Sequence, residues 1–470
     1  MSSRPAETPT RRNLRWSMID GSAYSVMVGI GELILPAFVL ALALGEVASG
    51  LIATLPPVVG GALQLGSHWG VRWLGSHKRW VLVMVALQVL SFVPLVIGAV
   101  WGTMPAWGVF AAAVAYWLGG AGAGAAWSTW IGTLVPGPIR PHWFGLRQRA
   151  LQIGTLVGFI AAGVTLGLLS SGQGLQGVTQ GGGGGGGGPA ARAVLIAFAG
   201  LFAVAGLCRA VSFLGLTKQS EPAPMPAGHR GVGVGQLWKR LRSDPRSVNG
   251  GRGGDVRLIA YMLAVSLASQ IAAPFVNPFL LEQHKTGYVA WSLLVGLVML
   301  GKIITLAALG RYARRHGARR LLWIGGVGMT FVGFMWAMAP ASPAAGSAAN
   351  AWPFFAWLVF VQLYSGFVWA CYELATWLLL LEHLDEHERT SLMSVYFAGN
   401  FLAAAVGSLL GGWLLATLGQ GAAAYQWIFV VSSVARLATV VPLWRVAQRA
   451  RQPQRVRVNT AGTESLRATE

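Results

Sequence analysis

Twelve apolar stretches, most of them twenty residues or longer, occupy the greater part of this chain and constrain its fold more than any other feature. A helix needs about 20 predominantly apolar residues to cross the roughly 30 Å hydrocarbon core of a bilayer. The composition agrees, because 54% of the residues are hydrophobic and only 11% are charged, whereas soluble domains carry about 25% charged residues. We therefore expect an all-α polytopic membrane protein with twelve transmembrane helices, and not a β-barrel built from short alternating strands.

The predicted spans cover residues 18–44, 47–69, 80–101, 106–133, 149–170, 193–215, 257–281, 289–310, 320–340, 352–381, 391–418 and 424–444. A connection rich in proline, glycine and charge separates the first six spans from the last six, as expected of a linker. The predicted organisation is an N-terminal tail (1–17), a six-helix half (18–216), a linker (217–256), a second six-helix half (257–445) and a C-terminal tail (446–470).

Lysine and arginine are concentrated in alternate connections. The turns expected on the outer side hold only Arg192 and Lys285, while the tails and the remaining loops carry nearly all other basic residues. By the positive-inside rule both termini are cytoplasmic, and the net charge of +20 faces lipid headgroups and not nucleic acid. Arginine outnumbers lysine thirty to five, a composition typical of a GC-rich bacterial genome, so we expect the cytoplasmic membrane of a bacterium.

The two halves repeat each other. Arg140 follows span four as Arg389 follows span ten, and a glycine comes eighteen residues later in both halves, at Gly158 and Gly407. The segments "LGSHKR" (74–79) and "HGARR" (316–320) follow spans two and eight in the same way. Duplicated six-helix halves are a recurring transporter plan, in which the substrate site lies between the halves near the bilayer midplane.

Several loops resemble those of the major facilitator superfamily. That family has a Gly-x-x-x-Asp-Arg-x-Gly-Arg-Arg motif after its second helix and a weaker copy after its eighth. Residues 310–320, "GRYARRHGARR", are similar to the second copy, and residues 71–79, "VRWLGSHKR", keep the glycine and the basic end of the first. Residues 134–149 and 381–400 resemble the connections into the fifth and eleventh helices. The resemblance implies alternating access of two six-helix halves.

The family's acidic position in this motif is occupied by Arg72 in the first copy and Arg314 in the second, so its usual gate contact is absent. We expect in its place an ionic latch between four acids after span ten, from Glu382 to Glu388, and five arginines after span eight. A charged loop exposed to water is the alternative, with less than about 1 kcal/mol for each exposed pair. The predicted cytoplasmic gate comprises Arg72, Lys78, Arg79, Arg140, Arg311, Arg314, Arg315, Arg319, Arg320, Asp385, Glu386, Glu388 and Arg389.

Three ionisable residues lie away from the edges of the spans: Glu32 in span one, Lys302 in span eight and Glu373 in span ten. A charge at the bilayer centre costs at least about 2.5–3.5 kcal/mol, so each needs a reason. The resemblance implies that helices one, four, seven and ten line the cavity, which places Glu32 and Glu373 there as candidate proton-coupling or substrate groups; neutralisation by a neighbour for packing alone is the alternative. Lys302 lies at the depth of Glu373 and could pair with it; a substrate or proton would then have to compete with Lys302, which makes it a third candidate coupling residue. Asp20 is interpreted as a helix N-cap.

Polar and aromatic residues on the cavity helices are the candidate substrate contacts: Tyr116, Trp127, Trp130, Gln270, Asn277, Gln362, Trp369, Tyr372 and Asn400. Aromatic faces beside carboxylates suit organic cations or sugars. Spans one, four, seven and ten have no arginine or lysine midway, which disfavours multiply anionic substrates. For any single tryptophan, a lipid-facing position is the alternative.

Together these features predict a secondary active transporter of a small organic solute, proton-coupled and monomeric, with no cofactor and no metal site. An exporter of organic cations or lipophilic compounds is the first expectation. Uptake of a neutral solute such as a sugar, and a non-transporting sensor or scaffold on the same fold, are alternatives. All eight histidines lie in loops or at membrane edges, and no catalytic group can be assembled within the bilayer, so we do not expect an enzyme.

Overall fold

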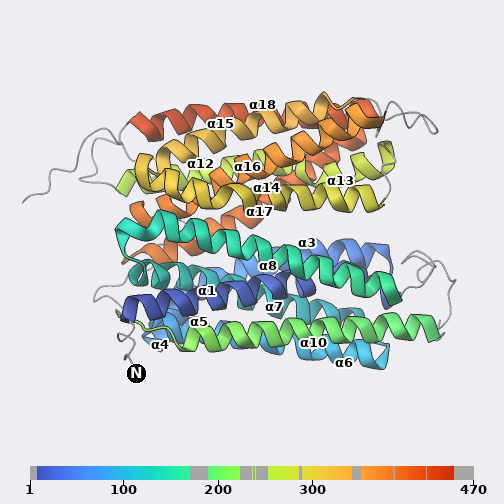
Figure 1. Ribbon diagram of the computed structural model, residues 1–470, viewed down its shortest axis with the longest axis horizontal. Coiled ribbons are helices and arrows are strands. Elements are labelled where there is room, and N and C mark those ends of the chain that lie inside the picture. The colour runs from blue at the N-terminus through green and yellow to red at the C-terminus, as the bar shows by residue number, and fades with distance from the viewer. Residues whose placement is uncertain are drawn as a thin grey trace, which may run out of the picture.

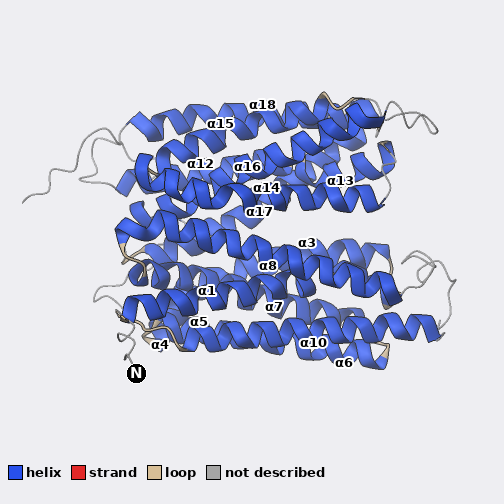
Figure 2. Ribbon diagram, in the orientation of Figure 1, coloured by secondary structure: helices blue, strands red, loops and turns tan. Residues whose placement is uncertain are grey.

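The structure, a computed structural model, describes residues 8–169, 189–222, 235–236, 239, 252–284, 288–340, 351–384, 387–419 and 421–448. All regular secondary structure in these ranges is helical (Figure 2). The helices run side by side in two layers, with the N-terminal half of the chain in one and the C-terminal half in the other (Figure 1). This arrangement is the predicted all-α polytopic membrane fold.

The N-terminal half makes six passes. They consist of α1 (Pro9–Met27), η1 (Val28–Glu32) and α2 (Leu35–Ala41); α3 (Glu46–Leu63), η2 (Gln64–Gly66) and α4 (Ser67–Leu74); α5 (His77–Leu90) and α6 (Phe92–Trp101); α7 (Ala106–Leu134); η3 (Gly137–Ile139) and α8 (Arg140–Leu169); and α10 (Pro189–Thr217).

The C-terminal half makes the other six passes. They consist of α12 (Arg252–Gln270), η4 (Ala273–Phe275), α13 (Val276–Pro278) and η5 (Phe279–Gln283); α14 (Tyr288–His316); α15 (Ala318–Ala337); α16 (Ala351–His383); α17 (Arg389–Leu418); and α18 (Ala422–Gln448). Within the described ranges, eleven helical runs are long and apolar enough to cross a membrane. With the second pass, built from α3, η2 and α4, they make up the twelve predicted passes.

The first pass begins earlier than predicted. Its helix starts at Pro9, with Thr8 as the N-cap residue, and not at residue 18. The polar sequence before residue 18 lowers the hydropathy without breaking the helix, since it contains no proline or glycine after Pro9. Asp20 therefore lies in the middle of α1, where its side chain is buried, and the prediction that it caps a helix is wrong.

The first and seventh passes are interrupted at comparable positions in the two halves. A π-helical turn, η1, separates α1 from α2, and a 3₁₀ turn around Pro274 separates α12 from α13. Proline lacks a backbone N–H and cannot continue the hydrogen-bond ladder of a helix, which accounts for the break at Pro274. Irregular turns in membrane helices are tolerated where the surrounding protein satisfies the freed backbone groups.

Glycines allow close helix crossings at equivalent places in the two halves. A Cβ added at Gly158 of α8 would lie 2.6 Å from the carbonyl oxygen of Val26 in the first pass, and one added at Gly407 of α17 would overlap the carbonyl oxygen of Leu267 in the seventh. Only a glycine lets two helix backbones approach this closely. The glycine correspondence noted in the sequence thus marks the same crossing in each half.

The halves meet along α8 with α14, and along α17 with α3 and α7. One end of the bundle, where α1 begins at Pro9 and α16 ends at His383, carries most of the basic loops and is called the basic end below. The N-terminus marks it in Figure 1. Near this end, Gly145 of α8 and Gly310 of α14 bring the two halves into backbone contact.

Candidate functional site

A cavity of about 230 Å³ lies between the halves. Helices α1, α5, α7, α8 and α10 of the N-terminal half form most of its wall, and α16 and α17 of the C-terminal half complete it through Leu374, Trp377 and Phe397. Because the wall is shared, any movement of one half against the other changes its shape. The polar residues in the wall are Asp20, Tyr24, Arg147, Gln148 and Arg209.

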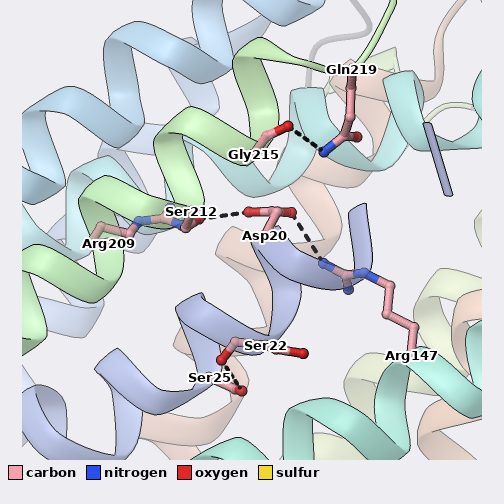
Figure 3. A network of polar contacts seen from close by, with 8 residues as sticks. All are labelled: Asp20, Ser22, Ser25, Arg147, Arg209, Ser212, Gly215 and Gln219. Atoms are coloured by element: carbon pink, nitrogen blue, oxygen red, sulfur yellow. Dashed lines mark hydrogen bonds and ion pairs between the residues drawn. The ribbon is translucent and has the colours of Figure 1, made fainter. Parts of the chain in front are cut away.

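Asp20 is the centre of a buried polar network (Figure 3). Its Oδ1 accepts a hydrogen bond of 2.6 Å from Ser212 Oγ, and its Oδ2 lies 3.5 Å from Nη2 of Arg147. Arg209 donates from Nη1 to Ser212 Oγ and from Nε to Gln88 Oε1, both at 2.7 Å. The network joins passes one, three, five and six, so it fixes the relative positions of four helices of the N-terminal half.

The two arginines also lie against aromatic faces. The guanidinium carbon of Arg147 is 4.4 Å from the centre of the Trp127 ring, and that of Arg209 is 4.8 Å from the centre of the Tyr24 ring. Such cation–π contacts stabilise a guanidinium that has lost its water. The cavity wall thus contains two guanidinium groups and one carboxylate, an excess of one positive charge.

Sequence reasoning missed this network for three separate reasons. Asp20 was taken for a helix cap, Arg147 was placed in the loop before span five, and Arg209 was not recognised as a charge within span six. The prediction that only three charges lie away from the span edges is wrong, because Arg209 and Arg436 are buried within α10 and α18. Their isolated position in apolar runs was the signal that could have found them.

Arg436 is the C-terminal counterpart of Arg209. Its Nη1 donates to the carbonyl oxygen of Met329 at 3.0 Å and its Nη2 to that of Ser269 at 3.4 Å. These contacts tie α18 to α15 and α12, as Arg209 ties α10 to the third pass. Arg436 does not line the cavity, and its contacts are those of a residue that holds helices together.

Lys302 and Glu373 form an ion pair, with 2.7 Å between Nζ and Oε1. Their pairing, inferred from equal depth in spans eight and ten, is confirmed. The side chains are 15% and 28% exposed, so the pair is not sealed within the protein. Close packing of Gly301 of α14 against Gly366 of α16 brings the two helices together just before the pair.

Glu32 lies in η1 and accepts a hydrogen bond of 2.7 Å from the hydroxyl of Tyr116. The structure thus brings together two residues that the sequence assigned to a common cavity. Neither contributes to the wall of the 230 Å³ cavity. Tyr116 is buried, and its ring also packs edge-on against Phe92, so the hydroxyl is held in place beside the carboxylate.

Trp127 is the predicted substrate contact that lies in the cavity wall. Its ring packs edge-on against Trp377 of the other half, with 6.0 Å between ring centres. Trp130, one turn further along α7, is only 1% exposed, and its indole N–H donates to the carbonyl oxygen of Ser220. Trp130 therefore anchors the end of pass six and does not contribute to the wall.

The other predicted contacts lie outside the wall of this cavity. Tyr372 is buried and donates to the carbonyl oxygen of Met262, and its ring packs edge-on against that of Trp369. Asn277 is exposed and accepts from the indole of Trp291. The remaining three are Gln362, which is buried, and Gln270 and Asn400, which are half-buried.

A polar contact near the basic end joins the two halves. Thr390, at the start of α17, lies 3.0 Å from Nε2 of His77 and 2.8 Å from Oγ1 of Thr129. All three are buried. His77 begins α5, directly after the loop that carries the first copy of the motif, so this loop end contacts the other half through an imidazole and a hydroxyl.

Arg140 and Arg389 make the same contacts in the two halves. Arg140 donates to the carbonyl oxygens of Gly132 and Val135, eight and five residues before it. Arg389 donates to those of Leu381 and Leu384, again eight and five residues before it. Basic groups at a helix C-terminus satisfy carbonyls that lack a partner within the helix, so these two predicted gate residues cap α7 and α16.

The two loops of the predicted ionic latch lie beside each other in the C-terminal half. Residues 311–320 and 382–388 both belong to the C-terminal half, so a contact between them cannot by itself join the halves. The contact seen there, 2.8 Å between Arg319 Nη2 and His383 Nε2, holds α15 to α16. Lys78 likewise stays within its own half, where its Nζ donates to the carbonyl oxygens of Thr217 and Gln219.

The other residues of the predicted gate fall into three groups. Exposed side chains belong to Arg72, Arg79, Arg311, Arg314, Arg315 and Arg320, and Glu388 is buried. Asp385 and Glu386 lie outside the described residues. Most arginines of the loop after α14 therefore have the exposure of a solvated basic loop, whereas Glu382 lies close enough to Arg319 and Arg140 to interact with their charges. The ionic latch stays a prediction.

Comparison with known proteins bears on both halves. Residues 257–469 match the sequence model of the Major Facilitator Superfamily. No curated protein matches the sequence. Among solved structures, the major facilitator transporter FucP in its outward conformation superposes with a TM-score of 0.70 at 10% identity, over 94% of this chain and 100% of that one.

Two further structures are similar over nearly their whole length. A bacterial homologue of the iron transporter ferroportin, in its outward-facing state, has a TM-score of 0.63 at 15% identity, over 93% of this chain and 99% of that one. The human organic anion transporter MFSD10 has a TM-score of 0.62 at 15% identity, over 94% and 100%. These are transporters and not enzymes. The sequence model of the Major Facilitator Superfamily thus matches the second half of the chain, and both halves together have a fold similar to that of solved transporters of this superfamily.

Proposed function

We propose that the protein is a proton-coupled secondary transporter that moves a small organic solute by alternating access of its two halves. One observation carries the proposal: a cavity whose wall is shared by both halves contains a buried ion pair, Asp20 with Arg147. A transporter of this kind needs a site that both halves touch, together with an ionisable group whose charge is linked to the state of that site.

The basic end is cytoplasmic in this proposal, because the positive-inside rule places lysine- and arginine-rich loops there. Both termini then lie in the cytoplasm, and the membrane is the cytoplasmic membrane of a bacterium. The buried contact of Thr390 with His77 and Thr129 joins the halves on that side and must break when the cavity opens to the cytoplasm. The proposed transporter works as a monomer, since each chain contains both halves.

Three carboxylates are candidates for the coupling proton. Asp20 lies in the cavity wall, Glu373 is paired with Lys302, and Glu32 is bonded to Tyr116. Burial disfavours an ionised carboxylate unless a partner offsets the lost hydration, so each can take up a proton when its partner moves away. Asp20 becomes the first candidate, because it is the acid that lies in the wall of the cavity.

The proteins of similar fold include an anion transporter and a homologue of an iron transporter. Their sequence identity to this chain is too low to indicate its substrate. The expectation of an organic cation rested on Glu32 and Glu373 facing the solute. Neither lies in the wall of the cavity described above, where positive charge is in excess. Uptake of a neutral sugar is the remaining alternative, and a non-transporting sensor is distinguished by the absence of any flux.

Flux into proteoliposomes tests the proposal. The purified full chain is reconstituted with a pH-sensitive dye inside, and a panel of small organic anions, cations and sugars is added under an imposed pH gradient. We expect one solute class to enter with a matching proton movement, and the proton movement to be lost in Glu373→Gln and Asp20→Asn. Solute flux that ignores the pH gradient would contradict proton coupling, and no flux for any solute would favour the sensor.

A further inference from the structure

Arg147 has hydrogen-bonding capacity that its neighbours do not use. Its contact with Asp20, at 3.5 Å, is much longer than the 2.7–2.9 Å of a charge-assisted hydrogen bond, whereas Asp20 makes its short bond with Ser212. The Nε of Arg147 is buried and has no hydrogen-bond partner among the described residues. A guanidinium presents five donors in a planar fork that matches a carboxylate, and in Arg147, which lines the cavity, part of that fork has no acceptor among the described residues.

The second arginine in the wall is held by neutral groups. Arg209 donates to Gln88 and Ser212 and lies over the Tyr24 ring, so no carboxylate bonds to it directly. Asp20 is the single carboxylate in the wall of this cavity. Two guanidinium groups and one carboxylate leave the wall with one uncompensated positive charge, and one negative charge on a bound solute would neutralise it.

The rest of the wall is apolar and the space is small. Trp127, Leu374, Trp377 and Phe397 line it, and the volume is about 230 Å³. An apolar cavity of about 150 Å³ accepts benzene, and pockets for drug-sized ligands measure about 300–1,000 Å³. The cavity therefore has room for one six-membered ring with a short polar substituent, and not for a large lipophilic compound.

We propose that the cavity binds a small monocarboxylate that carries an aromatic or similarly apolar ring. The carboxylate accepts hydrogen bonds from Arg147, which turns its fork from Asp20 to the solute, and the ring lies against Trp127, Trp377 and Phe397. Asp20 keeps its bond to Ser212. This inference rests on the proposed function for its biological meaning, and it replaces the organic cation expected from sequence.

Equilibrium binding to the purified full chain in detergent tests the inference without any need for transport. The probe is radiolabelled benzoate, and the competitors are unlabelled benzoate, benzamide and benzylamine, which share the ring but differ in charge. We expect saturable benzoate binding that unlabelled benzoate displaces and that benzamide and benzylamine do not. Arg147→Gln should weaken binding at least tenfold, while Arg149→Gln, an exposed arginine of the same helix, should leave it unchanged.

A second pair of variants keeps the charges intact. Gly124 lines the cavity, and nothing lies within 4 Å of a Cβ added there, so the side chain of Gly124→Leu starts in open space and takes up part of the cavity. Gly163 has the same open surroundings but is exposed and lies outside the wall. We expect Gly124→Leu to weaken benzoate binding at least tenfold and Gly163→Leu to leave it unchanged.

The outcomes separate this inference from the proposed function. Preference for benzylamine or benzamide, or no binding of benzoate, would overturn the carboxylate proposal while leaving transport of another solute open. Benzoate binding that is as strong in Arg147→Gln and in Gly124→Leu as in the wild type would overturn the assignment to this cavity. Binding as expected, together with a failure of every flux assay, would leave the site standing and remove the transporter proposal alone.

Discussion

Replacing Asp20 with asparagine should lower the free energy of unfolding by about 3–5 kcal/mol, the usual cost of removing one partner from a buried ion pair. Asparagine keeps the shape of the side chain and can still accept from Ser212, so the change tests charge and not packing. Without the carboxylate, Arg147 and Arg209 stay buried in a cavity wall whose lining contains no other carboxylate. Thermal unfolding of the purified protein in detergent measures the effect.

Two comparisons make that result specific. Arg72→Gln removes a charge from an exposed side chain and should change the unfolding midpoint little. The double variant Asp20→Asn with Arg147→Gln removes one charge of each sign and should recover much of the stability lost in Asp20→Asn alone. If Asp20→Asn is as stable as the wild type, the carboxylate does not offset the two arginines, and the network would have to be held by its neutral hydrogen bonds.

Lys302→Met should also destabilise the protein, by about 2–3 kcal/mol, because it leaves Glu373 without its partner at a depth where an unpaired charge costs about that much. The partial exposure of the pair keeps the effect below that expected for Asp20. Lys302→Met combined with Glu373→Gln removes both charges and should be more stable than either single variant. Unfolding midpoints of the four proteins form a double-mutant cycle that isolates the pair.

A matched control for this cycle is Lys218→Met, which removes an exposed lysine just beyond the end of α10 and should leave the midpoint unchanged. Residues in one ion pair usually show an interaction energy of about 0.5–3 kcal/mol. Strict additivity of Lys302→Met and Glu373→Gln would mean that the 2.7 Å contact contributes nothing to stability. The Lys302–Glu373 pair would then act in proton coupling and not in stability.

The membrane passes, and the correspondence between the passes of the two halves, could largely be predicted from the sequence. Hydropathy locates a membrane helix because lipid cannot satisfy an exposed backbone, so each span is helical and apolar over most of its length. The repeat was also visible in the sequence from the matching positions of Arg140 and Arg389. In the structure each of them caps a helix through carbonyls eight and five residues before it. Equal depth in parallel helices was enough to suggest the contact between Lys302 and Glu373.

The cavity could not be predicted in the same way. Helices α1 and α8 begin at Pro9 and Arg140, where the apolar windows begin at residues 18 and 149, so each helix extends nine residues beyond its window. Asp20 and Arg147 lie at or before those window edges and were therefore treated as cap and loop residues. Their meeting with Arg209 depends on how passes one, five and six pack together, which hydropathy does not encode.

The central claim is that solute crosses because the two halves move apart at the basic end, where Thr129 of α7 contacts Thr390 of α17. Their Oγ1 atoms are 2.8 Å apart, so cysteines at both positions should form a disulfide after a modest adjustment. The background is Cys208→Ala with Cys371→Ala, which removes the native thiols. The readout is solute flux in proteoliposomes before oxidation, after oxidation and after reduction.

We expect oxidation of the Thr129→Cys, Thr390→Cys protein to stop flux, reduction to restore it, and the two single-cysteine proteins to transport normally throughout. Complete cross-linking with undiminished flux would contradict the account, because a protein whose halves are locked at this end could not be opening there to release solute.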